Sequence, residues 1–457
     1  MQTKRRTIKE VLARTAALVA WLILCSSQAA VGLERQPLSV YKARRHALAD
    51  RLHGGFAVLF GATDPPLEYM SFRQDEDFYY LTGWNDPGAA ILIFAAVPAD
   101  GSQPARDYRE IMLLPERNLR MEFYTGKKLA ADSPEAPRIT GFDQVMPISG
   151  FATQLVREGL VDPAKPFNAY SQQDSPQAAT FLNYLATTLG MEKAPAWRDV
   201  REKTMELRSV KDQSELELMR KASNASVVAQ RAMMKAVRPG VSERAIEGLI
   251  ISKLLEEGCE RTSYPSIVGS GKNSTTLHYS ENTEIMKSGD VVVVDAAGEY
   301  SMYASDITRT LPVNGHFTAR QREIYDIVLG AQRAAVEAFV PGVSTINDRL
   351  HRDPHSLDQA AFDYMNAHGK DLHGGPLGKY FIHGLGHSVG LDVHDPYDYE
   401  KPLSKGVVFT IEPGIYIPEE KLGVRIEDVF YVDDSGHLVE LTSALPHTAD
   451  EIEAAMK

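Results

Sequence analysis

The chain contains very little cysteine: Cys25 and Cys259 are the only two in 457 residues. Cys25 lies in an N-terminal segment that we expect to be removed, so the mature chain would carry Cys259 alone and could form no intrachain disulfide. Stability must therefore come from sources other than disulfides, an apolar core above all. Nucleophilic use of Cys259 is not expected, because the neighbouring Glu257 and Glu260 raise rather than lower the pKa of a thiol.

Several familiar motifs are also missing. No Gly-rich phosphate loop and no Ser-His-Asp arrangement stands out, and there are no low-complexity tracts. Basic residues are outnumbered, 49 against 61 acidic ones, which gives a formal net charge of −12. This balance argues against nucleic acid or an anionic membrane as a partner. The length and composition, with 44% hydrophobic and 24% charged residues, are otherwise those of a soluble protein of two or three domains.

The first 29 residues have the order of a secretory signal. Five basic residues precede an apolar run over 16–24 and the small residues SSQAA. We expect cleavage after Ala29 and export to the periplasm or the extracellular space. The apolar run is short for a membrane span. An uncleaved anchor, a twin-arginine route through Arg5-Arg6 and a lipid on Cys25 are the alternatives, although Leu24 is larger than the usual residue before a lipidated Cys.

Residues 291–309, VVVVDAAGEYSMYASDITR, place two acids among strand-forming residues. Four valines lead into Asp295, and Asp306 follows 11 residues later. A Val-rich run of this kind is typical of a buried strand. A carboxylate at the end of such a strand is costly unless a cation meets it. Taken alone, the two acids are equally explained by a turn-capping Asp and an ion pair with Arg309.

The same pattern occurs a second time. Each copy has a Gly six residues before an acid, then Gly and Tyr, then a second acid: Gly289, Asp295, Gly298, Tyr300, Asp306 and Gly406, Glu412, Gly414, Tyr416, Glu427. AVRPGVSE (236–243) is likewise echoed by AFVPGVST (338–345). This self-similarity indicates one supersecondary unit used twice. Two copies related by a pseudo-twofold axis would bring four carboxylates to one centre, which requires cations, and we expect two of them.

Residues 381–395, FIHGLGHSVGLDVHD, carry His383, His387 and His394, and His278 lies before the first acidic block. The glycines of this stretch make a helix poor, and no Glu follows His383, so the HExxH zinc motif is absent. We predict a strand or tight loop lining a cleft. A single His is usually a core or surface residue, but four of them beside a carboxylate cluster indicate a functional site.

Residues 33 to about 195 are predicted to form a first α/β domain. A helix is expected over 42–52, and strands over 56–62, 89–97 and 110–115. The composition of 71–90 slightly favours a strand edge with a solvated turn at Asn85-Asp86-Pro87 over a wall of a substrate cleft.

A polar stretch over 190–212 marks the predicted domain junction. Ser214 and Glu217 have the spacing of a capping box, which would open a long helix ending at RPG, residues 238–240. Further helices are expected over 243–257 and 322–339, the latter being the long helix of the second copy.

Four carboxylates and one imidazole form an oxygen-rich set of ligands. Such a set suits Mn, Fe, Co or Zn in a dinuclear site better than a structural zinc. Two bridged ions would lower the pKa of a shared water, and neutral histidines could donate hydrogen bonds to a substrate carbonyl. The residues by themselves therefore indicate metal-assisted hydrolysis, most simply of an amide.

The sequence resembles the aminopeptidase P branch of the pita-bread metallopeptidases, relatives of prolidase and methionine aminopeptidase. The resemblance covers essentially the whole mature chain and is strongest from Ile267 to Phe430. It is carried by IVGSGKNSTTLHY, VVVVDAAGEYSMYASDITRTLPVNGHFT, HGLGHSVGLDVHD, TIEPGIY and GVRIEDV, and by FRQDEDFYYLTGWNDP near the N-terminus. This last stretch matches a block of the family's N-terminal domain, which overturns the preference for a plain strand edge there. The export signal is a departure, as many bacterial relatives look cytosolic.

The resemblance implies a mixed α/β (α+β) fold. Residues 33–200 would form a creatinase/aminopeptidase P-like domain, and 201–457 a duplicated pita-bread catalytic domain. The family's metal ligands fall on Asp295, Asp306, His387, Glu412 and Glu427, with Asp306 and Glu427 bridging both ions. The resemblance also implies that Glu412 accepts the proton of water, that His278, His383 and His394 form the substrate site, and that Arg425 supports the acidic cluster.

The expected activity is release of the N-terminal residue from peptides with proline at position two. Two divalent ions are implied, in the first place Mn²⁺, with Co²⁺, Fe²⁺ or Zn²⁺ as alternatives. A homo-oligomer, dimer or tetramer, is expected, with no membrane association after signal removal. A prolidase would use the same ligands but accept only dipeptides. A creatinase-like enzyme or a non-catalytic relative would lack part of the ligand set.

Overall fold

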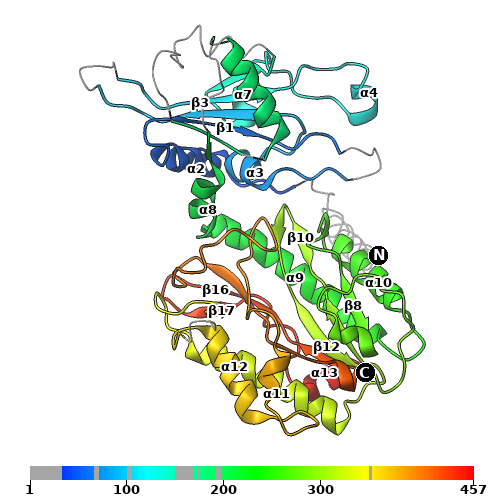
Figure 1. Cartoon of the computed structure of the whole chain (residues 1–457). Helices are drawn as coiled ribbons and strands as arrows, with labels where there is room; N and C mark the ends of the chain where they lie inside the picture. The colour runs from blue at the N-terminus through cyan, green and yellow to red at the C-terminus, as the bar shows by residue number, and fades with distance from the viewer. Residues whose placement is uncertain are drawn as a thin grey trace, which may run out of the picture. The chain divides into compact units, whose positions relative to one another are not determined.

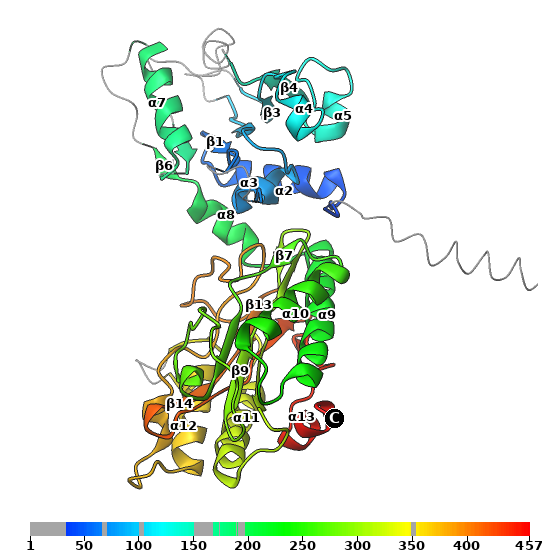
Figure 2. The ribbon, with the colours of Figure 1, turned by 90° about the vertical axis from the view of Figure 1, so that its right-hand side faces the viewer.

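The computed structural model describes residues 33–65, 71–99, 105–149, 168–172, 174–188, 190, 197–348 and 353–457 (Figures 1 and 2). The predicted signal over 1–29, with Cys25 and the cleavage site after Ala29, lies outside these residues. Among the residues described, no helix is both long enough and apolar enough to span a membrane.

The N-terminal domain is built on a six-stranded mixed sheet in the order β4-β3-β2-β1-β5-β6. Its strands are β1 (Phe56–Phe60), β2 (Ala90–Phe94), β3 (Arg109–Leu114), β4 (Gln144–Pro147), β5 (Ala169–Ser171) and β6 (Arg198–Asp199). Its helices are α2 (Leu38–Asp50), α3 (Glu76–Thr82), α4 (Glu122–Thr125), α5 (Ala136–Thr140) and α7 (Pro176–Thr188). The strands β1 to β3 and the helix α2 confirm the elements predicted at those places.

The central strands are buried on both faces, which is why their sequences are continuously apolar rather than alternating. Phe56, Val58 and Phe60 of β1 share a core with Phe181 of α7. The other faces of β1 and β2 contact α3 and α2. The sheet is therefore covered by helices on both sides.

Residues 71–90 do not form the strand edge that their composition favours, and they are not among the residues that line the main cavity. The chain forms α3 instead, because the Asp75 side chain accepts a hydrogen bond from Phe78 N (2.8 Å) and caps the first turn. Gly83 ends the helix in the left-handed region, with φ 58°. Most of the helix is buried, including Phe78 and Tyr80.

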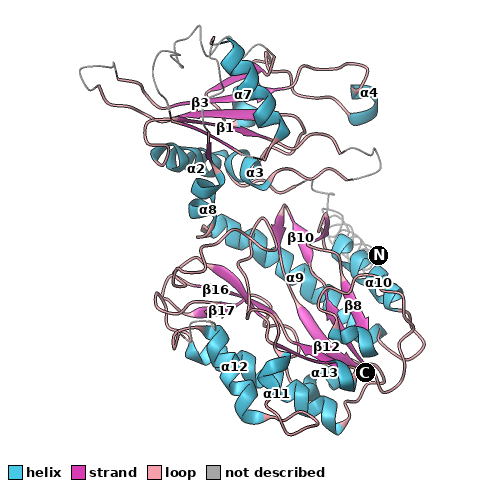
Figure 3. Ribbon diagram, in the orientation of Figure 1, coloured by secondary structure: helices cyan, strands magenta, loops and turns pink. Residues whose placement is uncertain are grey.

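The second half of the chain follows α8 (Arg201–Arg208) and contains two similar sets of elements (Figure 3). The first set is α9 (Gln213–Ala236), α10 (Glu243–Glu256), β7 (Arg261–Thr262), β8 (Ile267–Ser270), η1 (Gly271–Thr275), β9 (Val291–Asp295), β10 (Gly298–Tyr300), β11 (Tyr303–Ala304) and β12 (Thr308–Pro312). The second is α11 (Ala319–Ala338), α12 (Leu357–His368), η2 (Leu377–Tyr380), β13 (Val408–Ile411), β14 (Gly414–Ile417), η3 (Pro418–Glu420), β15 (Leu422–Arg425), β16 (Asp428–Val432) and β17 (Leu438–Glu440), after which α13 (Ala449–Ala455) follows.

The two copies correspond strand by strand around the acids. In the first, β9 pairs antiparallel with β12, and the small β10–β11 hairpin lies between these two strands in the sequence. In the second, β13 pairs antiparallel with β16, and the β14–β15 hairpin lies between them. A bridge between Thr308 and Glu427 joins the copies at the acidic ends, where Glu427 N donates to Thr308 O (3.1 Å). One unit is thus used twice, as the repeat predicts.

The helix starts differ from those expected. The capping box of α9 is formed by Asp212 and Glu215, not by Ser214 and Glu217. The Asp212 carboxylate accepts hydrogen bonds from the backbone N–H groups of Ser214 (2.8 Å) and Glu215 (3.0 Å), so the helix begins two residues earlier. Similarly, Thr318 caps α11, which begins at Ala319 rather than at 322.

Candidate metal centre

One cavity of about 550 Å³ opens in the second half of the chain. Its lining includes every residue that the sequence singled out for metal or substrate: His278, Asp295, Asp306, His383, His387, His394, Glu412, Arg425 and Glu427. The four carboxylates come from two hairpins more than 100 residues apart in the sequence, so their convergence is a property of the fold.

Local strand geometry places the acids at the ends of the paired strands. Asp295 is the last residue of β9, and its register partner is Thr308 at the start of β12. Glu412 directly follows β13, and Glu427 directly precedes β16. Each hairpin therefore carries one acid at the end of its first strand and one just before its second strand. The small inner hairpin lies between these two acids in the sequence.

Three of the four carboxylates are buried: Asp295 is 8% exposed, Asp306 5% and Glu427 1%. Burial raises the pKa of Glu427 well above its usual range, and the nearby charges of Asp306, Glu412 and Asp295 raise it further. Burial also raises the pKa of Asp295 and of Glu412. Acids that resist ionisation so strongly need positive charge if all are to be ionised at neutral pH.

The donor atoms fit a divalent cation. Ligand atoms of Asp306, His387 and Glu427 all lie within 4.8 Å of one another. Asp295 Oδ1 and Asp306 Oδ1 are buried with no hydrogen-bond partner among the described residues. A buried carboxylate oxygen without a donor is costly, and a metal ion would satisfy it.

The imidazole of His387 is oriented toward the acids. Its Nδ1 lies 3.2 Å from Ser388 O, so a proton there would be donated to that carbonyl and Nε2 would be free as a ligand. Nε2 lies 3.3 Å from both Asp306 Oδ2 and Glu412 Oε1. Burial lowers the pKa of His387, but the hydrogen bond to Asp306 and the charges of Glu412 and Asp306 outweigh it and raise the pKa to about 9. The carboxylates that hold this proton would equally hold a cation.

Neighbouring side chains hold the acids in place. Arg425 Nη2 donates to Asp295 Oδ2 (2.7 Å), and Arg425 Nε donates to Thr308 Oγ1 (3.1 Å). Thr308 Oγ1 in turn donates to Glu427 Oε2 (2.7 Å). In the second copy, Thr410 Oγ1 donates to Glu412 Oε1 (3.1 Å). One hydroxyl from each copy thus orients one acid.

The remaining histidines surround the acids. The ring of His394 lies 4.1 Å from that of His387, centroid to centroid. Burial lowers the pKa of His394, and the adjacent His387 lowers it further, so His394 is neutral at neutral pH. His383 Nε2 lies 2.9 Å from Tyr416 OH. Neutral imidazoles at these places can donate hydrogen bonds to a substrate oxygen.

Two family models match this chain. Metallopeptidase family M24 matches residues 217–434, and Aminopeptidase P, N-terminal domain, matches residues 41–160. The chain is 34% identical to the Xaa-Pro aminopeptidase of Haemophilus influenzae over 404 residues, covering 84% of this chain and 88% of the relative. It is 32% identical to the Xaa-Pro aminopeptidase of Escherichia coli over 449 residues, covering 91% and 97%. The chain belongs to the aminopeptidase P family.

Solved structures agree with this assignment. The low-pH form of aminopeptidase P from Escherichia coli superposes with a TM-score of 0.80 at 30% identity, covering 93% of this chain and 99% of that one. The predicted fold class, an aminopeptidase P N-terminal domain followed by a pita-bread domain, is confirmed. The chain is a hydrolase of the M24 metallopeptidases, which use divalent metal ions.

Some residues of the aminopeptidase P site were not assigned from the sequence. Tyr416 belongs to the repeated Gly and Tyr pattern, but only the structure shows its hydroxyl accepting from Arg425 Nη1 (2.9 Å) and contacting His383. Asn347 lines the cavity, and its side chain bonds Leu385 N (2.8 Å) and Gly386 O (2.6 Å). It lies between α11 and α12 of the second copy, in a stretch that carries no motif, so a single sequence gives no signal for it.

Proposed function

We propose that this chain hydrolyses the first peptide bond of peptides with proline at position two and releases the N-terminal residue. The relatives named Xaa-Pro aminopeptidase, which match more than four fifths of the chain, support this assignment. The observation that carries it is the single cavity holding all five proposed metal ligands together with three further histidines.

The proposed ligands of two divalent ions, in the first place Mn²⁺, are Asp295, Asp306, His387, Glu412 and Glu427, with Asp306 and Glu427 shared between the ions. Oxygen ligands with one imidazole suit Mn²⁺, although Co²⁺, Fe²⁺ and Zn²⁺ accept the same set. Such ions, when bound, polarise a carbonyl oxygen and lower the pKa of water.

Side chains of this protein are proposed to transfer the proton, to bind the substrate and to orient the acids. Glu412 is proposed to accept the proton of the attacking water, since its carboxylate lines the cavity and is oriented by Thr410 Oγ1 (3.1 Å). His394 is proposed to donate a hydrogen bond to the substrate carbonyl, and His278 and His383 are proposed to line the substrate site beside it. Arg425 holds Asp295 in place. None of these contacts requires an N–H group on the scissile amide, and an Xaa-Pro amide has none.

A prolidase with the same ligands is the alternative. A substrate panel separates the two: Xaa-Pro dipeptides, Xaa-Pro-Yaa peptides and Xaa-Ala-Yaa peptides, each with added Mn²⁺. We expect turnover of Xaa-Pro-Yaa and little turnover of Xaa-Ala-Yaa. Turnover of dipeptides alone would identify a prolidase, and equal turnover of Xaa-Ala-Yaa would overturn proline selectivity.

A matched pair of Glu variants tests the catalytic assignment. Glu412→Gln should abolish turnover of the preferred peptide. Glu420→Gln should leave it unchanged, because Glu420 is held by Arg320 (2.8 Å) and is not among the residues that line the cavity. Activity of Glu412→Gln equal to that of Glu420→Gln would remove Glu412 from the mechanism.

We further propose the organisation of the chain: an exported protein with a signal over 1–29, an N-terminal domain over 33–200 and a catalytic domain over 201–457. The family matches at 41–160 and 217–434 fall inside these two domains, which supports the boundary. A homo-oligomer is proposed as well. Light scattering of the purified protein would give its mass, and a monomer would contradict this proposal.

A further inference from the structure

Residues 387–395, here called the histidine loop, are closed at a narrow neck. Asp395 N donates to Ser388 O (2.9 Å), so the two ends of the loop meet. The residue before each neck position is a histidine, His387 before Ser388 and His394 before Asp395. The neck therefore fixes the distance between these two imidazoles, whose rings lie 4.1 Å apart in the cavity.

Two buried cations hold the neck. The carboxylate of Asp395, which is 2% exposed, accepts from Arg208 Nη2 at Oδ1 (2.6 Å) and from Lys211 Nζ at Oδ2 (3.0 Å). Oδ1 also accepts from Asp392 N (3.2 Å), inside the loop. Lys211 Nζ lies 3.4 Å from Ser388 Oγ on the other side of the neck. Both neck residues are thus held from outside the loop.

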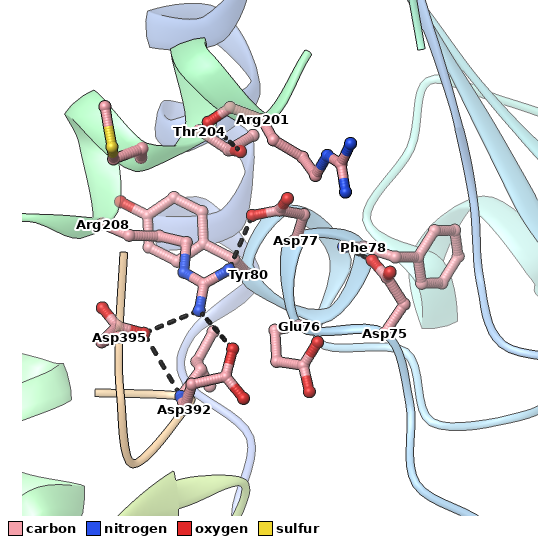
Figure 4. Close-up of polar contacts among 12 residues, drawn as sticks. Asp75, Glu76, Asp77, Phe78, Tyr80, Arg201, Thr204, Arg208, Asp392 and Asp395 are labelled. Atoms are coloured by element: carbon pink, nitrogen blue, oxygen red, sulfur yellow. Dashed lines mark hydrogen bonds and ion pairs between the residues drawn. The ribbon is translucent and has the colours of Figure 1, made fainter. Parts of the chain in front are cut away.

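Arg208, at the end of α8, connects this neck to the N-terminal domain. Its Nη1 donates to Asp77 Oδ1 of α3 (2.8 Å), and its Nη2 also donates to Asp392 Oδ2 (3.2 Å). Figure 4 shows the guanidinium between Asp77 on one side and Asp392 and Asp395 on the other. A second contact runs parallel to this one, because Arg73 Nη2 donates to Leu391 O (2.7 Å).

Stability alone does not explain this cluster. Buried ion pairs are often no more stabilising than apolar side chains of the same volume, because desolvation offsets the attraction. A guanidinium does offer a rigid planar fork that fixes several acceptors at set distances, which an ammonium group cannot do. The contacts also include both residues that follow the two histidines, Ser388 and Asp395, besides two residues inside the loop.

We propose that Arg208 is a positioning residue for His394: by clamping Asp395 at the neck of the histidine loop against Asp77, it holds the His394 imidazole in register with the acidic centre. This proposal rests on the proposed role of His394 in Xaa-Pro hydrolysis. It makes the N-terminal domain part of what shapes the substrate site, although α3 itself does not line the cavity.

A double-mutant cycle between Arg208 and His394 tests the proposal. Arg208→Lys keeps the charge but loses the fork, and it should lower kcat/KM for the best Xaa-Pro peptide about 10- to 100-fold, the effect of a misplaced catalytic group. In a His394→Ala background the same change should cost less than about threefold, because the group being positioned is gone. Metal content by elemental analysis should equal that of the wild type.

Arg45→Lys is the matched control. Arg45 is as buried as Arg208 and forms a two-pronged pair with Glu110 (2.7 and 3.0 Å), but in the N-terminal domain, away from the loop. Its effect on kcat/KM should be small and equal in both backgrounds. Equal factors for Arg208→Lys in both backgrounds, or no effect at all, would overturn the proposal and leave a structural role.

Asp77→Asn provides a second variant if Arg208→Lys does not fold. It leaves the pair of Arg208 and Asp395 in place and should show a smaller loss with the same dependence on His394. A loss that is independent of His394 would overturn the proposal. If the wild type cleaves Xaa-Pro peptides but His394→Ala is fully active, the positioning proposal fails while the proposed function stands. If the wild type cleaves none, the proposed function fails.

Discussion

At the scale of the residue, buried carboxylates are neutralised in two different ways. The cavity acids contact the cationic groups of Arg425 and His387, and two of their oxygens lack a hydrogen-bond donor among the described residues. Asp428, Glu440 and His447 also place three possible ligand atoms together. There, however, Arg309 Nη2 donates to Asp428 Oδ1 (2.7 Å) and His447 Nε2 contacts both acids, so the group is an internal ion cluster.

Replacing a proposed bridging acid should release metal. Asp306→Asn or Glu427→Gln should lose at least one ion per chain, because a neutral amide is a poor substitute for a bridging carboxylate. Activity should fall roughly 100-fold or more, since an ion supplies several kcal/mol of charge stabilisation. Elemental analysis of the purified variants checks this. Asp86→Asn, which alters a surface pair with Lys128, should keep its metal. Full metal content in Asp306→Asn would contradict the ligand assignment.

The His447 cluster should make stability depend on pH. Burial lowers the pKa of His447, but hydrogen bonds to Asp428 and Glu440 outweigh it and raise the pKa to about 9. A raised pKa means that protonated His447 stabilises the folded state at pH below about 6.5, and that this contribution is lost as pH rises toward 9. The cost of His447→Gln should therefore shrink, by on the order of 2 kcal/mol, between pH 6 and pH 9.5.

Denaturant unfolding of the wild type and of His447→Gln at the two pH values measures this difference. His316→Gln serves as control, because the side chain of His316 is 69% exposed beside Glu453 and surface pairs contribute little. A cost of His447→Gln that is the same at both pH values would show that the charge of His447 does not stabilise the fold.

At the scale of the element, the two copies differ in how their helices begin but agree in how their strands present acids. The start of a helix depends on which side chain accepts hydrogen bonds from the free backbone N–H groups. In α9 that side chain is Asp212 and not Ser214. The strand ends depend only on register, which places Asp295 opposite Thr308 and Ile411 opposite Asp428. The period of the strands is therefore the more dependable signal in the sequence.

One helix should gain stability from a single substitution. Gly248 is an exposed interior residue of α10, and a Cβ there would have nothing within 4 Å. Gly248→Ala should stabilise the protein by about 0.5–1 kcal/mol, the helix propensity difference. Gly386→Ala should do the opposite, since its Cβ would lie 2.0 Å from Thr410 O, beside the histidine loop. Denaturant unfolding distinguishes the two signs, and destabilisation by Gly248→Ala would show that α10 is constrained at this position.

At the scale of the whole molecule, the buried Cys259 agrees with a fold that does not rely on thiol chemistry. Burial raises the pKa of its thiol to about 12, and the acids Glu260, Glu299 and Glu257 contribute in the same direction. A thiol that stays protonated at neutral pH is inert. Cys259 is also the only cysteine among the described residues, so no disulfide joins two of them.

The mature protein should begin near Ala30. Basic residues, an apolar run and small residues in that order are typical of a secretory signal, and we predict cleavage after Ala29. Mass spectrometry of the extracytoplasmic protein gives the N-terminus directly. Replacing Ala29 with a bulky residue should leave the signal attached, because the peptidase requires small side chains at the site. An intact Met1 on exported wild-type protein would contradict the prediction.

The sequence by itself determined the chemistry of the site. Asp295, Asp306, Glu412 and Glu427 follow from the spacing of two local strand patterns, and His383, His387 and His394 from one Gly-rich stretch. The roles proposed for these residues and for His278 come from the family resemblance. The spacing of residues along a strand is set by the two-residue period of the strand itself, so it can be recognised in the sequence before the fold is known. The apolar strands β1 to β3 were predictable for another reason, because strands buried on both faces are continuously apolar.

Only the tertiary structure decided which residues support that chemistry. Arg208 and Asp395 are 187 positions apart, and Asp77 lies in another domain. The stretch 71–90 has the composition of a strand edge, yet it contains a helix that begins after Asp75 and ends at Gly83. Asp77 of this helix accepts a hydrogen bond from Arg208. Which cation meets which buried carboxylate depends on how separate elements pack, and a single sequence carries no local pattern for that choice.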